Sequence, residues 1–466
     1  MRKPTLLLLL GPAALALLPL TACENDPPNG AGPDLAMDGS VATFDATTST
    51  FDAPAPDAST PDAPPGPFVS VTVDGSRGPK AGVRIVFHDT KGAVIETKLT
   101  GADGRAIHTG PTPAMASALL AVGRQPHIVT WTGVEDGDEL HVRDEDAEEM
   151  VGIYQVTFSS FSDSGANQYF VASPCGTNMS YGTATELPLY GRCAGSQNAV
   201  LATARTFSGN VTGHSFKRGN AAVTDGGTGA ITLGDWKAPS TLTLSVLNAP
   251  GDGSFDARLL EVADGAGFPS RIRTSEGSNV VFSIATGFAD AYQTTIAATD
   301  ATDSRRTIAK RFAPSTSVAL DYASLLPAID DASLDTSNPR RPIVSWTAGS
   351  SAGTDGGLVQ ISFLGSQNKF HYWTFVVPPG SDTVTAPEMP AEAESFLPFA
   401  PDSGMESYFR IPEVLFMEAD ILPSYASFRS RHHELLGLPL GFYDFNLSAL
   451  RTNGTYRTTR SPAVGM

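Results

Sequence analysis

The chain has 466 residues, and its composition is that of an acidic protein. It carries 31 Lys and Arg against 49 Asp and Glu, which gives a formal charge of −18 at pH 7. Proteins that bind DNA or RNA obtain most of their affinity from a basic surface, so this charge excludes nucleic acid as a partner. Charged residues make up only 17%, while 45 Gly and 35 Pro favour short strands joined by turns.

Residues 1–22 have the pattern of a secretory signal peptide. Arg2 and Lys3 precede an apolar stretch from Thr5 to Leu20 that two prolines interrupt. A membrane-spanning helix needs about 20 consecutive apolar residues, and no later stretch approaches that length. We therefore expect an exported chain whose main body is soluble, with a formal charge of −20 once the two basic residues of the signal are removed.

The signal ends at a cysteine. Leu20-Thr21-Ala22-Cys23 resembles the lipobox of bacterial lipoproteins, and it lies directly after the apolar stretch. The resemblance implies cleavage before Cys23 and attachment of acyl chains such as palmitate, which would anchor the protein to a membrane. Each buried methylene contributes about 0.8 kcal/mol, and stable anchoring takes more than one chain. Glu24 in place of an aspartate favours the outer membrane or cell surface. An ordinary signal peptide with an incidental cysteine is the alternative.

Residues 23–67 are predicted to be a disordered stalk behind the lipidated cysteine. The segment after Cys23 contains eight acidic residues, nine prolines and no Lys or Arg, with a loose x-Asp-Ala repeat. Such a composition cannot bury enough apolar surface to offset the entropy of ordering, and charge repulsion and proline keep it extended.

A first β domain is predicted for residues 68–142. Apolar residues alternate at Val69, Val71 and Val73, and tight turns are expected at Lys91-Gly92 and Ala102-Asp103-Gly104. The segments Gly78–Ile85 and Thr100–Ala106 resemble the carboxypeptidase regulatory-like domains, which are small prealbumin-like β-sandwiches. The resemblance implies the fold of this sixth of the chain and almost nothing about its function, since the module serves as a spacer in many secreted proteins.

Two segments near the end of this domain are ambiguous. Thr112–Val122 fits a short helix and a strand equally well. Residues 136–149 contain eight acidic side chains, and we interpret them as a solvated hinge. A calcium loop is the alternative, but Leu140 and His141 stand where an EF-hand needs a ligand and a glycine.

Residues 143–330 are predicted to be a β-rich domain with a disulfide. Cys175 and Cys193 are the two cysteines left in an oxidising compartment, so a bond between them is the default expectation. It would close a loop of about 19 residues and stabilise the chain by about 3 kcal/mol in the chain-entropy model. A metal site or a reactive thiol would need a further cysteine or a nearby histidine.

Residues 331–466 are predicted to be a β-rich C-terminal domain with one short helix. Ser324–Pro342 is interpreted as the linker, which puts a boundary near residue 330. In the helix, Tyr425, Phe428 and Leu435 are the apolar positions, Ser424 is the expected cap and Gly437 the stop. Strands of both domains are expected at 153–161, 242–247, 256–262, 280–284, 293–298, 344–347, 359–364 and 370–377.

Several patterns resemble catalytic or metal-binding motifs without their context. Gly349-Ser350-Ser351-Ala352-Gly353 matches the spacing of a nucleophile elbow, but a strand and not a helix is expected after it. His433-Glu434 lacks the second histidine of a zinc protease, because position 437 is glycine. We expect His432 and His433 to be surface residues. The sequence thus predicts no catalytic residues, no metal and no cofactor.

One strand has the composition of a binding surface. Phe370 and Tyr372 would face one side of it, and His371, Trp373 and Phe375 the other. Aromatic residues on both faces favour a strand buried between two layers. The alternative is an open platform of Phe370, Tyr372 and Trp373 on which a sugar could stack.

These observations predict a mainly β protein, with tandem β-sandwich domains behind a disordered stalk rich in Pro, Asp and Ala. The expected function is that of a cell-envelope lipoprotein that binds or scaffolds a protein or polysaccharide ligand and is not an enzyme. Two alternatives stay open. One is a surface carbohydrate-binding protein or adhesin, and the other an extracytoplasmic hydrolase whose catalytic residues meet only in the fold.

Overall fold

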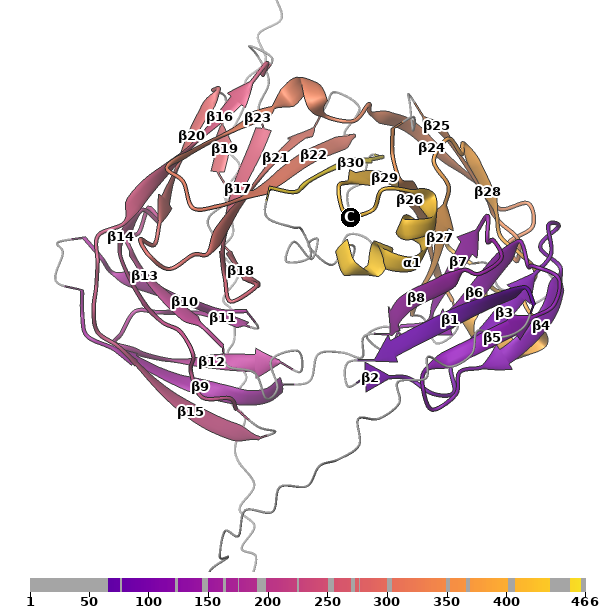
Figure 1. Cartoon of the computed structure of the whole chain (residues 1–466), viewed down its shortest axis with the longest axis horizontal. Helices are drawn as coiled ribbons and strands as arrows, with labels where there is room; N and C mark the ends of the chain where they lie inside the picture. Colours follow the sequence, from indigo (N-terminus) through magenta and orange to yellow (C-terminus); the bar gives the residue numbers. More distant parts are fainter. Residues whose placement is uncertain are drawn as a thin grey trace, which may run out of the picture. The chain divides into compact units, whose positions relative to one another are not determined.

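The computed structural model confirms the mainly β fold class (Figure 1). It describes residues 66–461 except for 76–77, 122–124, 145–149, 162–164, 175, 191–197, 224–225, 250–254, 270–272, 276, 300–303, 349–352, 366–368, 401–406 and 436–452. In the described part of the chain, no helix is both long enough and apolar enough to cross a membrane. The predicted stalk lies outside the described residues.

In the first sheet of the N-terminal segment, β1 pairs antiparallel with β2 and with β5. It also pairs in parallel with β8. Val69, Val71 and Val73 of β1 are completely buried, as their alternation predicts. The acidic segment 136–149 is not a simple hinge, because β8 forms within it and adds a strand to the sheet. The bounds are β1 (Phe68–Gly75), β2 (Gly78–Pro79), β5 (Arg105–Thr109) and β8 (Glu139–Asp144).

The second sheet of this segment continues into the C-terminal part of the chain. The ambiguous stretch 112–122 contains strand β6, and the order β4-β3-β6-β7 is extended by parallel pairing of β7 with β27. His127 lies opposite Tyr372, and Trp131 opposite Val376. The bounds are β3 (Arg84–His88), β4 (Val94–Leu99), β6 (Met115–Leu120), β7 (His127–Thr132) and β27 (Phe370–Val377).

From β27 the same sheet runs on through strands of the middle and C-terminal segments. Its order is β18-β17-β21-β22-β30-β29-β26-β27-β7-β6-β3-β4, and with β19 beside β17 it has 13 strands. The expected domains therefore share one sheet. The added strands are β17 (Phe255–Ala263), β18 (Ala266–Pro269), β19 (Arg273–Ser275), β21 (Ala291–Thr299), β22 (Arg305–Phe312), β26 (Gly356–Leu364), β29 (Glu413–Ala419) and β30 (Thr455–Arg460).

Three smaller sheets belong to the middle segment. Their orders are β11-β10-β13-β14, β12-β9-β15 and β20-β16-β23. Their alternating burial follows the apolar pattern of the sequence. The strands are β9 (Met150–Phe158), β10 (Gln168–Ser173), β11 (Gly176–Ser180), β12 (Ala184–Tyr190), β13 (Val200–Arg205), β14 (Val211–Lys217), β15 (Gly227–Leu233), β16 (Ser240–Leu247), β20 (Asn279–Ile284) and β23 (Ser317–Asp321).

The last sheet, β24-β25-β28, corrects the predicted linker. Strand β24 lies inside the stretch 324–342, so the boundary expected near residue 330 falls within a strand. Only one face of β24 is apolar, and the Asp and Ser residues on its other face gave the sequence the composition of a linker. The bounds are β24 (Ile329–Asp335), β25 (Ile343–Ala348) and β28 (Thr383–Thr385); the short 3-10 helices are η3 (Tyr322–Ser324) and η5 (Ala391–Phe396).

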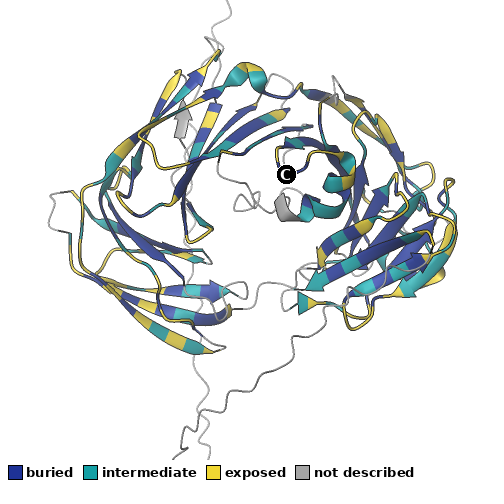
Figure 2. Ribbon diagram, in the orientation of Figure 1, coloured by how far each residue is buried: buried dark blue, intermediate teal, exposed yellow. Residues whose placement is uncertain are grey.

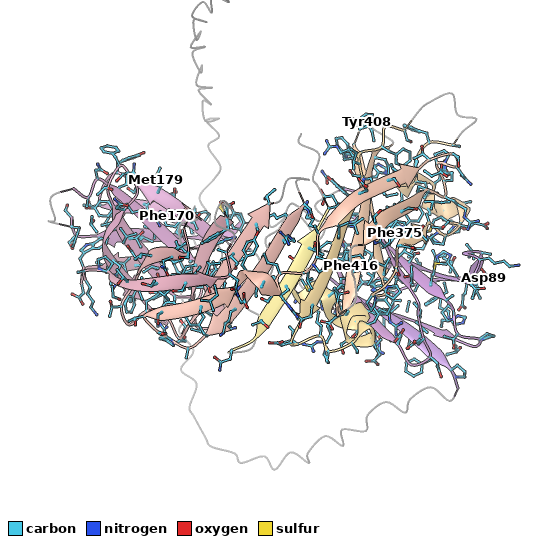
Figure 3. All side chains as sticks on the ribbon, turned by 90° about the horizontal axis from the view of Figure 1, so that it is seen from above. Asp89, Phe170, Met179, Phe375, Tyr408 and Phe416 are labelled. Carbon is cyan, nitrogen blue, oxygen red and sulfur yellow. The ribbon has the colours of Figure 1, made fainter. Side chains whose placement is uncertain are left out.

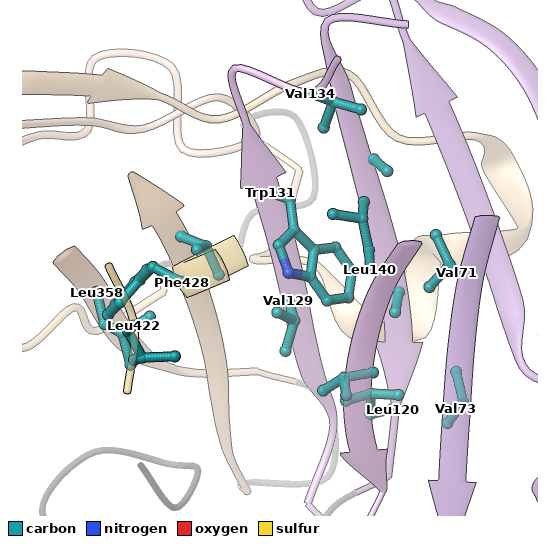
Figure 4. Close-up of a cluster of buried hydrophobic side chains, with 14 of the residues drawn as sticks. Val71, Val73, Leu120, Val129, Trp131, Val134, Leu140, Leu358, Leu422 and Phe428 are labelled. Carbon is teal, nitrogen blue, oxygen red and sulfur yellow. The ribbon is translucent and has the colours of Figure 1, made fainter. Parts of the chain in front are cut away.

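The central strands of the long sheet are covered on both faces, as Figure 2 shows by their burial. One face packs with β1, β8 and helix α1 (Tyr425–Leu435) in a core that contains Val71, Trp131 and Phe428 (Figure 4). The opposite face packs against β25 in a second core that contains Trp373 and Trp346. Burial on both faces explains why strand β27 carries large aromatic and aliphatic side chains on both of its faces.

Candidate functional site

Helix α1 brings charged and aromatic side chains together on one of its faces. Tyr425, Phe428, Arg429 and His432 stand at positions i, i+3, i+4 and i+7, so they share one face of the helix. That face packs on β26 and on the end of β7, the loop 133–138 and β8. We call this contact the helix clamp, because it fastens a C-terminal helix to the N-terminal segment.

Arg429 is the centre of the helix clamp. Only 1% of it is exposed, which is rare for an arginine. Its guanidinium donates to the carbonyl of Gly133, to Glu135 Oε2 at 3.1 Å and to Asp138 Oδ1 at 3.0 Å. Burial raises the pKa of Asp138, and the N–H of Glu135 and the charge of Arg429 oppose that rise. Three acceptors thus face the buried cation, although its Nε–H has no partner among the described residues.

Two aromatic side chains complete the helix clamp. The Tyr425 hydroxyl lies 2.7 Å from the Thr132 carbonyl oxygen and 3.0 Å from that of Val376, so it can donate to either β7 or β27. The Trp131 Nε1–H donates to the Arg429 carbonyl at 3.1 Å. Burial raises the pKa of Tyr425, which keeps its hydroxyl a donor at neutral pH. These bonds tie α1 to the two strands that join the segments.

Phe428 requires a glycine beneath it. Its ring occupies the space that a Cβ at Gly356 of β26 would need. Any larger residue at position 356 would push the helix away from the sheet. The helix clamp therefore depends on local features of three segments that are far apart in the sequence.

Histidines extend the helix clamp toward β8, which corrects the expectation that His432 and His433 lie on the surface. His432 is completely buried and His433 largely so, and the rings of His433 and His141 are 4.1 Å apart. His141 Nε2 lies 2.7 Å from Asp74 Oδ2 on β1. Among the described residues, no group of three or more His, Cys, Asp or Glu could hold a metal ion.

Burial of His432 predicts an acid-sensitive helix clamp. Burial lowers the pKa of His432 from 6.5 to about 4, partly opposed by the carbonyls of Arg429 and Phe428. Below pH 6.5 the unfolded chain takes up this proton first, so stability is full above that pH and falls until about pH 4. The ionisable groups around His432 are His433 and Arg429 on α1 and His141 on β8.

His432→Phe is therefore expected to make the pH dependence of the unfolding free energy shallower. The difference should be about 1.4 kcal/mol per pH unit between pH 6.5 and 4. Urea titrations of the whole chain at three pH values would measure it. Equal slopes for the two proteins would show that His432 is protonated in the folded state as easily as in the unfolded one.

The structure places the expected aromatic platform inside the protein. Trp373 is completely buried, its ring stacks on Phe375 and its Nε1–H donates to Thr130 Oγ1 at 2.9 Å. Tyr372 is 4% exposed, and half-buried Phe370 is covered by the guanidinium of Arg410, 3.8 Å from the ring centre. A sugar cannot stack on these three rings as they lie, because the adjacent layers occupy their faces.

One serine–histidine pair exists in the described part, but no substrate could reach it. His88 Nε2 lies 2.9 Å from Ser117 Oγ, which is itself 2.8 Å from Thr130 Oγ1. All three side chains are completely buried. The pair therefore belongs to a polar network inside the sheet. Ser351 of the Gly-Ser-Ser-Ala-Gly loop, and Cys23, Cys175 and Cys193, lie outside the described residues.

Burial shifts the acidity of Glu261 and Asp355 strongly. Burial raises the pKa of Glu261 to about 7, although the Ala285 N–H donates to it. Burial also raises the pKa of Asp355 to about 6, and the nearby Glu418 and Asp420 contribute. Glu261 lies on β17 and Asp355 precedes β26.

The helix clamp could have been found in part from the sequence. The spacing of Tyr425, Phe428, Arg429 and His432 marks one helix face, and an arginine within an apolar face signals a buried ion pair. The partners Glu135 and Asp138 lie about 290 residues earlier and carry no local signal.

Comparisons with known proteins add no identity. No family model and no curated protein matches this chain. Similar solved structures include the Bacillus anthracis TIE protein (11% identity over 55% of this chain and 50% of that one, TM-score 0.16) and the shaft pilin spaA of Lactobacillus rhamnosus GG (9%, 36% and 97%, TM-score 0.15). The chicken CNTN1 FN1-FN3 domains align at 9% identity over 56% and 86%, with a TM-score of 0.14. Scores this low carry no argument about this chain.

Proposed function

We propose that this protein is a lipid-anchored scaffold or binding module of the bacterial cell envelope. The observation that carries the proposal is the helix clamp together with the sheet it supports. Arg429, Tyr425 and His432 are used to hold segments of the chain together. In the helix clamp these side chains are bonded to the backbone and to the carboxylate of Asp138, so their role there is to fix the position of α1.

The way the segments are joined fits a scaffold role. β7 of the N-terminal segment pairs with β27, and β22 of the middle segment pairs with β30 near the C-terminus. A third contact is made by Arg341, which donates to the Lys91 carbonyl at 2.8 Å and to Glu388 at 3.0 Å. In the proposed arrangement, the lipid on Cys23 and the segment 24–67 hold this body at a membrane. The pairing of Cys175 with Cys193 remains a prediction.

Cys23→Ser tests the anchor. The variant is expected to lose labelling by a radioactive or clickable palmitate analogue, because the thiol that accepts the acyl chain is gone. It should also move from the membrane fraction to the soluble fraction, since one signal peptide without acyl chains does not give stable anchoring. Cell fractionation with and without detergent would measure both effects.

Cys175→Ser is the matched control, because it removes a different cysteine and should leave labelling and fractionation unchanged. If Cys23→Ser stayed in the membrane fraction and kept its label, the anchor would be wrong. The scaffold role would then have to rest on the folded body alone.

A further inference from the structure

Strand β4 is the last strand of the 13-stranded sheet, and its outer edge has no strand partner among the described residues. It carries three of the exposed large apolar side chains, Val94, Ile95 and Leu99, of which Leu99 is 56% exposed. An exposed strand edge with apolar side chains is a template for pairing with another strand. The question is which strand fits it.

The hydrogen bonds of β4 determine which residues face outward. The Thr100 N–H donates to the Val83 carbonyl at 2.9 Å, and Lys98 and Glu96 follow as partners of Ile85 and Phe87. In an antiparallel pair, residues bonded to the neighbour alternate with residues whose N–H and C=O point away from it. Thr97 and Leu99 therefore present their backbone groups at the free edge, whereas a register shift between Phe87 and His88 interrupts the alternation at Ile95.

We propose that the protein forms a two-fold symmetric dimer in which β4 pairs antiparallel with β4 of a second copy, centred on Thr97. In this register Thr97 lies opposite Thr97 of the second copy, and Ile95 lies opposite Leu99 twice. Thr97 and Leu99 are outward-facing residues, as the backbone bonds of the regular part of β4 require. Between them Glu96 lies opposite Lys98 twice, so every cross-strand pair is chemically matched.

The charges select this register over its neighbours. The two strands can also pair in neighbouring registers that keep outward-facing residues opposite one another. The nearest of these registers are centred on residue 96 or on residue 98. The first would place Glu96 against Glu96, and the second Lys98 against Lys98, and like charges directly opposite destabilise a sheet. Only the register centred on Thr97 brings opposite charges together.

The side chains are available for this pairing. Glu96 contacts Lys98 of its own strand at 3.2 Å and His108 at 2.7 Å, and the Lys98 ammonium donates to the Ile107 carbonyl at 2.5 Å. About a third of each side chain, 35% for Glu96 and 32% for Lys98, is still exposed. In a monomer, the same two charges would protect the edge against pairing. The experiment has to separate these two roles.

Cysteine cross-linking on the whole exported chain tests the register. In Thr97→Cys the two thiols would lie on directly opposite residues with Cα atoms about 5.5 Å apart, within the range of a disulfide. Mild oxidation should convert most of this variant into a covalent dimer. Ile95→Cys should give at least about tenfold less, because its symmetry mate lies four residues away along the paired strand, roughly 13 Å. The parent chain sets the background of the native cysteines.

Charge exchange tests the recognition. In the Thr97→Cys background, Glu96→Lys or Lys98→Glu alone places like charges opposite one another and should reduce cross-linking about tenfold. The double exchange Glu96→Lys with Lys98→Glu restores opposite charges and should restore the dimer. It also removes the contacts to His108 and Ile107, so recovery cannot be due to the fold of the single chain. Limited proteolysis would verify that each variant is folded.

Three results would overturn the proposal: no dimer with Thr97→Cys, equal cross-linking at positions 95 and 97, or a folded double exchange that stays monomeric. In each case we would conclude that Glu96 and Lys98 protect the edge of β4 against pairing with another strand. Two results together would establish the dimer. The double exchange should recover cross-linking, and cross-links should form only at position 97 or between an Ile95→Cys chain and a Leu99→Cys chain that have been mixed. This outcome is independent of the lipid anchor.

Discussion

Trp373→Ala is expected to lower the free energy of unfolding by about 3–5 kcal/mol, the usual cost of emptying a site filled by a buried aromatic side chain. Trp373 is completely buried in the core formed by β25, β26 and β27, where its ring stacks on Phe375. The substitution also leaves Thr130 Oγ1 without the donated hydrogen bond. Because β27 pairs with β7, the damage should reach the N-terminal segment as well.

The measurement requires the whole chain, since a fragment that begins near residue 331 would lack β7 and expose the edge of β27. Denaturant unfolding followed by circular dichroism would give the difference. Tyr408→Ala is the control, because this aromatic side chain is 66% exposed (Figure 3) and should change stability by less than about 0.5 kcal/mol. Equal stability of Trp373→Ala and the parent would mean that Trp373 is not packed in a core.

Arg429→Ala is expected to cost a similar amount, about 3–5 kcal/mol, for a different reason. Removing one partner of a buried ion pair leaves the other charge without compensation. Asp138, which is 13% exposed at its side chain, would lose its cation, and the Gly133 carbonyl would lose a donor. We expect α1 to detach from β8, so that proteolysis near residue 429 becomes faster at the same time.

Arg340→Ala is the matched control, because this arginine also pairs with a carboxylate, Glu394, at 2.5 Å. Glu394 is 68% exposed, and an ion pair in contact with water contributes at most about 1 kcal/mol. Equal losses for the two arginine variants would contradict the helix clamp. A larger loss for Arg429→Ala, together with recovery of part of it in the double variant with Asp138→Asn, would support it.

The joined sheet changes how the N-terminal segment is understood. Its resemblance to carboxypeptidase regulatory-like domains implies an independent spacer, whereas its strand β7 pairs with β27 and its 133–138 loop binds Arg429. An independent spacer would leave both edges of its sheets to water or to a linker. Here the edge at β7 pairs with β27 of the same chain, and the edge at β4 would pair with a second copy in the proposed dimer.

The sequence by itself determined part of the local structure of this protein. The alternation at Val69, Val71 and Val73 and the helix after Ser424 are present as predicted, because burial on one face imposes a period of two on a strand and 3.6 on a helix. The turn at Asp103-Gly104 is also local. Gly104 adopts φ +73°, and a Cβ there would approach the Val73 carbonyl to 2.6 Å. Many strands were not expected from the sequence, among them β10 to β15, β22, β29 and β30. In β30, Tyr456 is the only large apolar residue, so the pattern of a strand is weak.

Only the tertiary structure decided which strands and charges meet. The backbone groups along a strand edge are the same for every residue, so nothing in β7 or β27 encodes their pairing across about 245 residues. The same holds for Arg429 and Asp138, since an ion pair is selected by the geometry that buries it. The expectation that His432 lies on the surface was wrong for the same reason. Its neighbours in sequence are polar, but the residues that surround it in space are Trp131 and Phe428.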